Sequence, residues 1–114
     1  MNREDIFVDP LIQPMSVDSN NGTMVMDAVK TIMQDLKGVH TTGGLSNISY
    51  GLPQRRIINR SFLLMMMANG FDSAIMGPLD LDIMAALKTG EMLVGQDSYC
   101  MNFLKAVRPG KIEA

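Results

Sequence analysis

The chain has 114 residues, of which 46% are hydrophobic, and its 10 Lys and Arg against 12 Asp and Glu leave a formal charge of −2. This length suits one domain or part of one, and the charge excludes the basic surface that binding of nucleic acid or of anionic membranes requires. One cysteine, with no CxxC and no Cys/His pair at metal-binding spacing, predicts no disulfide, no bound metal and a reducing, cytoplasmic setting, and no apolar run resembles a membrane span or signal peptide.

The first half of the chain alternates strand-like and helix-like segments. Residues 5–9 (DIFVD) form a short apolar run that stops before Pro10, because proline cannot donate within a central ladder. After turn residues 18–23, apolar residues recur at helical spacing over residues 24–36, and Gly38 ends that helix. The β-branched residues of segment 39–44 (VHTTGG) predict a second strand.

The second half repeats the alternation. A wide apolar helical face covers residues 55–69, and Asn69 with Gly70 forms a C-terminal cap. A third strand is predicted over residues 71–76 (FDSAIM), ended by a turn at residues 77–78. A helix capped by Asp80 or Asp82 then runs to Leu93, and a last helix spans residues 97–107 before a frayed tail.

This order of elements predicts the α/β class, with parallel strands joined by right-handed crossovers. Three βα units would leave unpaired sheet edges, which parallel sheets normally bury. A closed (β/α)₈ barrel takes about 250 residues. The chain therefore corresponds to part of such a barrel. Either partner chains complete the barrel, or the chain is a fragment of a longer one.

Polar residues gather where the first two predicted strands end, which is where parallel sheets place ligand sites. Asp9 supplies a carboxylate after the first strand. The GGLSN segment (residues 43–47) supplies glycines that permit close approach, followed by the neutral groups of Ser46 and Asn47. These groups suit a flat heterocycle, because a carboxylate can accept two N–H bonds from the edge of such a ring.

Each candidate also has an ordinary structural interpretation. Asn47 could bond to its own turn, Asp9 could cap nearby N–H groups, and Arg55 and Arg56 could form a solvated first helical turn. His40 is expected to be packed or hydrogen-bonded rather than catalytic, since no nucleophile is spaced around it. The 12 methionines are expected mainly to fill the core.

Three stretches closely resemble the C-terminal part of methyltetrahydrofolate:corrinoid methyltransferases, which are pterin-binding proteins. They are VDPLIQP (8–14), TGGLSNISYGLPQRRIINRSFLLMMMANGFDSAI (42–75) and YC (99–100), in the family's order and spacing. The resemblance implies a homo-oligomeric (β/α)₈ barrel, to which residues 1–114 would supply strands six to eight and their helices. It also implies methyl transfer from N5 of methyltetrahydrofolate to the cobalt of a cobalamin that a partner corrinoid protein carries.

The resemblance assigns a catalytic role to Asn47, which matches the asparagine that meets N5 of the folate. An amide can stabilise charge at N5 as the methyl departs, because it donates a hydrogen bond without titrating. In-line transfer to cobalt needs no covalent enzyme intermediate, which agrees with a sequence that offers no nucleophile with a base. Tyr50 departs from the Gln of one branch of the family. The other implied substrate-binding positions are Asp9 for the pterin edge, Gly44 and Ser46 in the same loop, Arg55 near the outer end of the cofactor, and Ile75 against the pterin.

Two other functions remain open. A dihydropteroate synthase-like protein would share the pterin barrel, but its last strand should carry a basic pattern that FDSAIM lacks. A non-catalytic scaffold would self-associate through open sheet edges and Met-rich helix faces. The corrinoid methyltransferases also draw pterin contacts from a DxN segment and a second asparagine that this chain lacks, so the isolated chain is expected to be inactive and to bind folate weakly or not at all.

Overall fold

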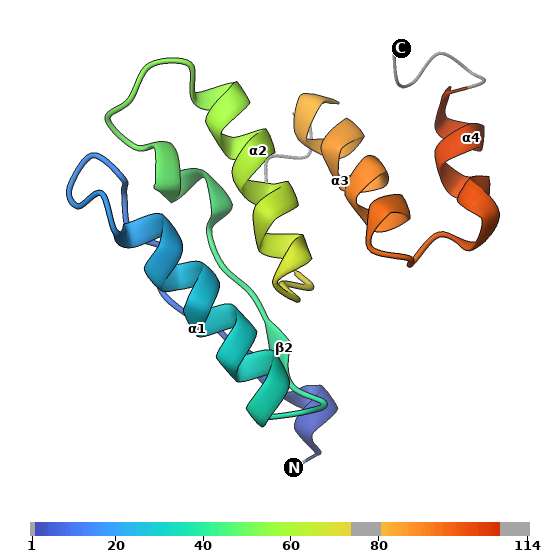
Figure 1. Cartoon of the computed structure of the whole chain (residues 1–114), viewed down its shortest axis with the longest axis horizontal. Helices are drawn as coiled ribbons and strands as arrows, with labels where there is room; N and C mark the ends of the chain where they lie inside the picture. Colours follow the sequence, from blue (N-terminus) through green and yellow to red (C-terminus); the bar gives the residue numbers. More distant parts are fainter. Residues whose placement is uncertain (1, 74–80, 108–114) are drawn as a thin grey trace.

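The computed structural model describes residues 2–73 and 81–107. Within these ranges the helices follow one another across the molecule in chain order (Figure 1). No helix of the described ranges has both the length and the apolar character that crossing a membrane requires. The elements are the 3₁₀ turn η1 (Arg3–Asp5), β1 (Phe7–Val8), α1 (Asn21–Asp35), β2 (His40–Thr41), the 3₁₀ turn η2 (Leu45–Ser49), α2 (Arg55–Ala68), α3 (Leu81–Leu93), the 3₁₀ turn η3 (Ser98–Cys100) and α4 (Met101–Val107).

β1 and β2 pair in parallel, with Phe7 beside His40 and Val8 beside Thr41. The His40 N–H donates to the Ile6 carbonyl at 2.9 Å, and the helix α1 connects the two strands. Parallel strands need such a crossover, which makes this segment a βαβ unit. Two parallel strands with helices confirm the mixed α/β class, although each strand is shorter than predicted.

The third predicted strand, over residues 71–76, is not formed in its described part. Residues 71–73 have no strand conformation, and residues 74–76 lie outside the described residues. Side chains reach β2 instead: Asp72 Oδ1 accepts from the Thr41 N–H at 2.8 Å, and Ser73 Oγ donates to the Thr41 carbonyl at 2.6 Å. The segment therefore lies beside β2, but in its described part side-chain bonds replace the backbone ladder.

The helix α1 starts before the predicted residue 24 and ends close to the predicted position. Gly38, predicted to stop it, has a φ of +99°, which glycine adopts without strain. Val25 and Val29 are buried, whereas Met24 and Leu36, expected on the apolar face, are 61% and 42% exposed. Met24 lies about 100° around the helix from Val25, which places it outside the buried stripe.

The helix α2 is confirmed almost to the residue, and the predicted cap is present, because Gly70 has a φ of +100° just after the helix. Leu63 and Met66 are no more than 1% exposed on its inner side. α3 packs closely against α2: a Cβ added to Gly90 would lie 2.6 Å from Met67 Sδ. This glycine lets the two helices approach.

Beyond α2, part of the predicted organisation lies outside the described residues. This holds for the turn at residues 77–78, the Asp80 cap and the tail over 108–114. α3 begins at Leu81, so Asp82 is inside the helix rather than its cap. The last helix starts later than the predicted residue 97, because Asp97 accepts from the N–H groups of Asn102 and Phe103, each at 2.9 Å, and so fixes its first turn.

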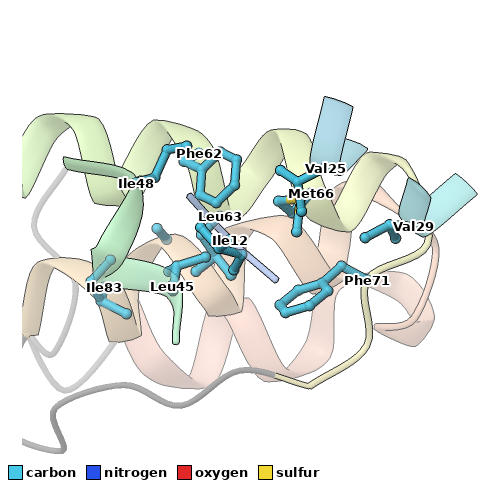
Figure 2. Packing of buried hydrophobic residues seen from close by; sticks show 11 residues of the cluster. Ile12, Val25, Val29, Leu45, Ile48, Phe62, Leu63, Met66, Phe71 and Ile83 are labelled. Atoms are coloured by element: carbon cyan, nitrogen blue, oxygen red, sulfur yellow. The ribbon is translucent and has the colours of Figure 1, made fainter. Parts of the chain in front are cut away.

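The core lies among α1, α2, α3 and the segments that follow the two strands (Figure 2). The molecule measures 39 × 38 × 20 Å, and its radius of gyration of 14.7 Å exceeds the roughly 13 Å of a compact domain of this length. A thickness of 20 Å accommodates one helix layer over one strand layer. The buried apolar cluster comprises Ile12, Val25, Val29, Leu45, Ile48, Phe62, Leu63, Met66, Phe71, Ile83 and Ala86, with Met15, Met26, Met33 and Met67 among the partly buried residues around it.

The two faces of the β1–β2 pair have different surroundings. Thr41 is fully buried and its Oγ1 lies 3.8 Å from Met33 Sδ of α1, so this face points toward the helices. Side chains alternate along a strand, so Phe7 and His40 occupy the opposite face. Phe7 is 59% exposed and stacks on His40 at 4.9 Å, while His40 Nδ1 lies 2.7 Å from Asp72 Oδ2. The expectation that His40 is packed or hydrogen-bonded is confirmed.

Candidate functional site

The loop that follows β1 and the segment that follows β2 lie against each other. Both belong to the carboxyl ends of parallel strands, where ligand sites form in such sheets. We call this region, residues 9–16 together with residues 43–50, the polar edge. Three hydrogen bonds join its two segments: from Met15 N–H to the Ile48 carbonyl (3.0 Å), from Ser16 Oγ to the Tyr50 carbonyl (2.8 Å) and from the Asn47 amide to the Ile12 carbonyl.

Asp9 is exposed at the start of the polar edge. Its Oδ1 accepts from the N–H of Leu11 at 2.8 Å, which is the local capping role that the sequence left open. The same oxygen lies beside the second segment, because a Cβ added to Gly43 would be 3.5 Å from it and 3.0 Å from Ile12 Cδ1. Gly43 thus permits the close packing of the two segments and brings Asp9 next to the GGLSN turn.

Asn47 lies in the middle of η2 and is exposed. Its side chain does not bond to its own turn, which was the structural alternative, since its Nδ2 donates across the edge to the Ile12 carbonyl. Asp9 and Asn47 therefore bind the consecutive residues Leu11 and Ile12 of one loop. This hydrogen bond from Nδ2 fixes the orientation of the Asn47 side chain. The second N–H of the amide and its Oδ1 make no hydrogen bond in the described part of the chain.

Arg55, in the first turn of α2, folds back onto η2. Its Nη2 donates to the Ser46 carbonyl at 2.8 Å and its Nε donates to Ser49 Oγ at 2.9 Å. The hydroxyl of Ser49, which is fully buried, donates in turn to Asn59 Oδ1 at 2.6 Å. Sequence analysis missed Ser49 and Asn59; the available signal was the spacing of four residues from Arg55 to Asn59, which places both on one face of the helix.

Gly44 and Ser46 occupy the outer side of η2. Gly44 has a φ of −78°, which any residue adopts, and a Cβ added there would meet nothing within 4 Å. Neither backbone conformation nor packing within the described chain therefore requires glycine, and the space beside it is open. Ser46 is exposed, and its carbonyl accepts a hydrogen bond from Arg55. Ile75 lies outside the described residues.

One cavity of about 300 Å³ lies away from the polar edge and is lined by α2, the segment with Asp72 and α3, which contributes Glu91. Another cavity, of about 390 Å³, lies between α1 and α2 and is mostly apolar; it reaches the polar edge, because Met15 and Ile48 line it together with Phe62. In residues 2–73 and 81–107, no three His, Cys, Asp or Glu side chains gather as metal ligands.

Comparison with known proteins places this geometry in context. No family model matches the chain. A methylcorrinoid:tetrahydrofolate methyltransferase of Eubacterium limosum is 36% identical over 107 residues, which make up 94% of this chain. This chain is a homologue of that methyltransferase. The matching region is 40% of the relative, so the chain corresponds to a portion of it, and the resemblance to corrinoid methyltransferases is confirmed.

Proposed function

We propose that this chain is part of a methyltransferase that moves a methyl group between N5 of a tetrahydrofolate and a corrinoid carried by a partner protein. The homology to the Eubacterium limosum methyltransferase over 94% of the chain carries the proposal. That relative is named for transfer from the methylcorrinoid, the reverse of the direction that the sequence resemblance implied. One site can serve both directions, because the groups that assist a step also assist its reverse.

The polar edge supplies the groups that a pterin ring needs. Asp9 is exposed, and its Oδ2 makes no hydrogen bond within the described chain, so it can accept N–H bonds from the aminopyrimidinone edge. The open space beside Gly44 allows the flat ring to approach the backbone. We also assign Ser46 to this binding surface, Arg55 to the outer end of the folate and Ile75 to a face of the pterin.

Asn47 is the proposed catalytic residue. Nitrogen is a poor leaving group, so N5 must gain a proton or a strong hydrogen bond as the methyl departs, and must lose that proton when a methyl arrives. The second N–H of the Asn47 amide can stabilise N5 without changing its own protonation. Water bound at the exposed edge would be the ultimate proton source. The corrinoid of the partner protein would donate or accept the methyl group, depending on the direction of transfer. The residues of this chain that are assigned a role all contact the folate.

The open face of β1 and β2 supports the proposal that residues 1–114 form strands six to eight of a (β/α)₈ barrel with their helices. Inward-facing side chains fill the interior of such a barrel. Phe7 and His40 lie on the face opposite the helices, and Phe7 is 59% exposed. The remaining length of the relative, of which the chain spans 40%, is enough to supply the other strands. The homology favours this function over a pterin synthase or a scaffold.

Calorimetry with tetrahydrofolate and methyltetrahydrofolate tests the proposal. The proteins are the isolated chain and a chimera in which this chain replaces the matching portion of the Eubacterium limosum methyltransferase. We expect the chimera to bind folate and the isolated chain to bind weakly or not at all. Asn47→Ala should weaken binding by the chimera about tenfold and slow transfer by about 10²-fold or more.

Asn102→Ala is the matched control, because it removes the same amide from an exposed position on α4. A folded chimera that fails to bind folate would contradict the proposed function. So would equal losses in the Asn47 and Asn102 variants. Low-micromolar binding by the isolated chain would contradict the proposal that it holds only part of the pocket.

A further inference from the structure

We propose that Ser49, with Arg55 and Asn59, is a positioning device that holds Asn47 in place for the reaction. The inference rests on the proposed function, and it assigns to Arg55 a task beyond contact with the ligand. Ser49 and Asn59 are not themselves assigned to the substrate, and Ser49 bonds to Ser46 and Arg55, so they act through the turn that carries Asn47.

The turn η2 is held from two sides. On the side of the β1 loop, the Asn47 amide and the Ile48 carbonyl bond to residues 12 and 15. On the side of α2, Arg55 bonds to the Ser46 carbonyl and the Ser49 hydroxyl. The residues next to Asn47 are therefore tied to a helix, while Asn47 itself is tied to the loop that carries Asp9. This arrangement fixes where the free N–H of the amide points.

The chemistry of Ser49 indicates a role in positioning rather than in simple packing. Burying a hydroxyl is unfavourable unless its hydrogen bonds are made, and alanine would occupy the same space without that requirement. Ser49 is fully buried, accepts from Arg55 Nε and donates to Asn59 Oδ1. A satisfied polar network of this kind specifies one arrangement of the groups around it.

The position of Arg55 supports the same conclusion. A cation in the first turn of a helix opposes the helix dipole, and the N-cap residue Gln54 makes no side-chain capping bond. Arg55 therefore does not help α2 to begin. Its planar guanidinium instead makes two separate bonds to η2 from Nε and Nη2, which a lysine ammonium cannot reproduce.

Hydrogen exchange measured by NMR on the 114-residue chain tests the positioning directly, with no folate present. In Arg55→Gln and Ser49→Ala we expect the amides that follow η2 to exchange about tenfold faster, the effect of losing one charge-assisted hydrogen bond. The side-chain amide resonances of Asn47 should shift as well. Arg60→Gln is the control, since it removes the same charge from α2 at a residue with no hydrogen bond to η2.

Kinetics of the chimera, with methylcobalamin and tetrahydrofolate as substrates, tests the consequence for catalysis. A positioning role predicts that Ser49→Ala lowers kcat by about 10- to 100-fold with KM changed less than threefold. Arg55→Gln should lower kcat by a similar factor and also raise KM, because it removes the proposed contact with the folate as well. Arg55→Lys, which keeps the charge and can keep one bond, should recover part of the loss. Circular dichroism of each variant confirms that it has folded, and Arg55→Lys serves as the second variant if Ser49→Ala does not fold.

The outcomes separate the two proposals. Unchanged exchange of the amides that follow η2 overturns the positioning role, and a raised KM with unchanged exchange shows that Arg55 acts by contacting the ligand. If a folded chimera does not bind folate, the proposed function fails, and if Asn47→Ala leaves methyl transfer intact, the catalytic role of Asn47 fails. In both cases the exchange measurement still reports on whether Ser49 and Arg55 hold the turn.

Discussion

The two faces of the β1–β2 pair differ in how completely the described residues bury their side chains. On the helix-covered face, Thr41 is fully buried, and Leu63 of the adjoining core is 1% exposed. On the other face, the ring of Phe7 stacks on His40 and remains 59% exposed. The first face is complete within the described residues. The second carries an aromatic ring that the other strands of the proposed barrel would cover.

The largest effect is expected on the covered side. Leu63→Ala should lower the free energy of unfolding by about 2–5 kcal/mol, because it removes buried contacts and leaves a cavity. Met65→Ala, on the outer side of the same helix at 52% exposure, should change it by less than about 0.5 kcal/mol. Urea unfolding followed by circular dichroism measures both. Similar losses in the two variants would mean that α2 does not present Leu63 to the core.

The edge of β2 should show the next largest effect. Asp72→Ala removes the acceptor of the buried Thr41 N–H and should cost about 1–3 kcal/mol of stability. His40→Ala removes the other partner of the same carboxylate but leaves that N–H satisfied, so its cost should be clearly smaller. Urea unfolding again provides the measurement. If His40→Ala is the more damaging variant, side-chain bonds from Asp72 do not replace the ladder of a third strand.

Neighbouring glycines at the polar edge give a finer comparison. Gly43→Ala should destabilise the chain by about 1 kcal/mol, because the new methyl would press on Ile12 and lie near Asp9. Gly44→Ala should stay within about 0.5 kcal/mol, since its methyl meets open space. In the chimera, however, Gly44→Ala should weaken folate binding by filling that space. Thermal unfolding and calorimetry together check the pair, and unchanged folate affinity in Gly44→Ala would count against a ring beside residue 44.

Phe7→Ala should have the smallest effect on the isolated chain, below about 0.5 kcal/mol, because the ring is already mostly in solvent. In the chimera the same substitution should cost about 3–5 kcal/mol, since the open face would then be the packed interior of a barrel. Unfolding of both forms in denaturant gives the two numbers. Equal small effects would contradict the assignment of Phe7 to an interior.

Sequence patterns predicted the elements whose signals are local. The wide apolar period and the following Asn69 and Gly70 located α2 closely, and a short apolar run before Pro10 located β1. The third strand was predicted wrongly in its described part, because composition cannot show that Asp72 and Ser73 satisfy β2 through side chains. These bonds depend on residues about 31 positions apart, which no local pattern contains.

The candidate site was predicted in part for the same reason. Strand-end position and residue type pointed to Asp9 and to the GGLSN turn, and the structure brings the two together. Their roles toward folate stay predictions. Ser49 and Asn59 were missed because a small polar residue carries no chemical signature until the fold shows that it is buried and bonded.

The hydrogen bonds at Thr41 determine where this chain can be divided into shorter segments. Asp72 and Ser73 follow the helix α2 in the chain, yet they complete the backbone of β2. A cut directly after α2 would leave a buried amide and carbonyl without partners, whereas a cut after Ser73 would not. A segment that is to keep β2 intact in shuffling experiments must therefore extend a few residues past α2, to Ser73.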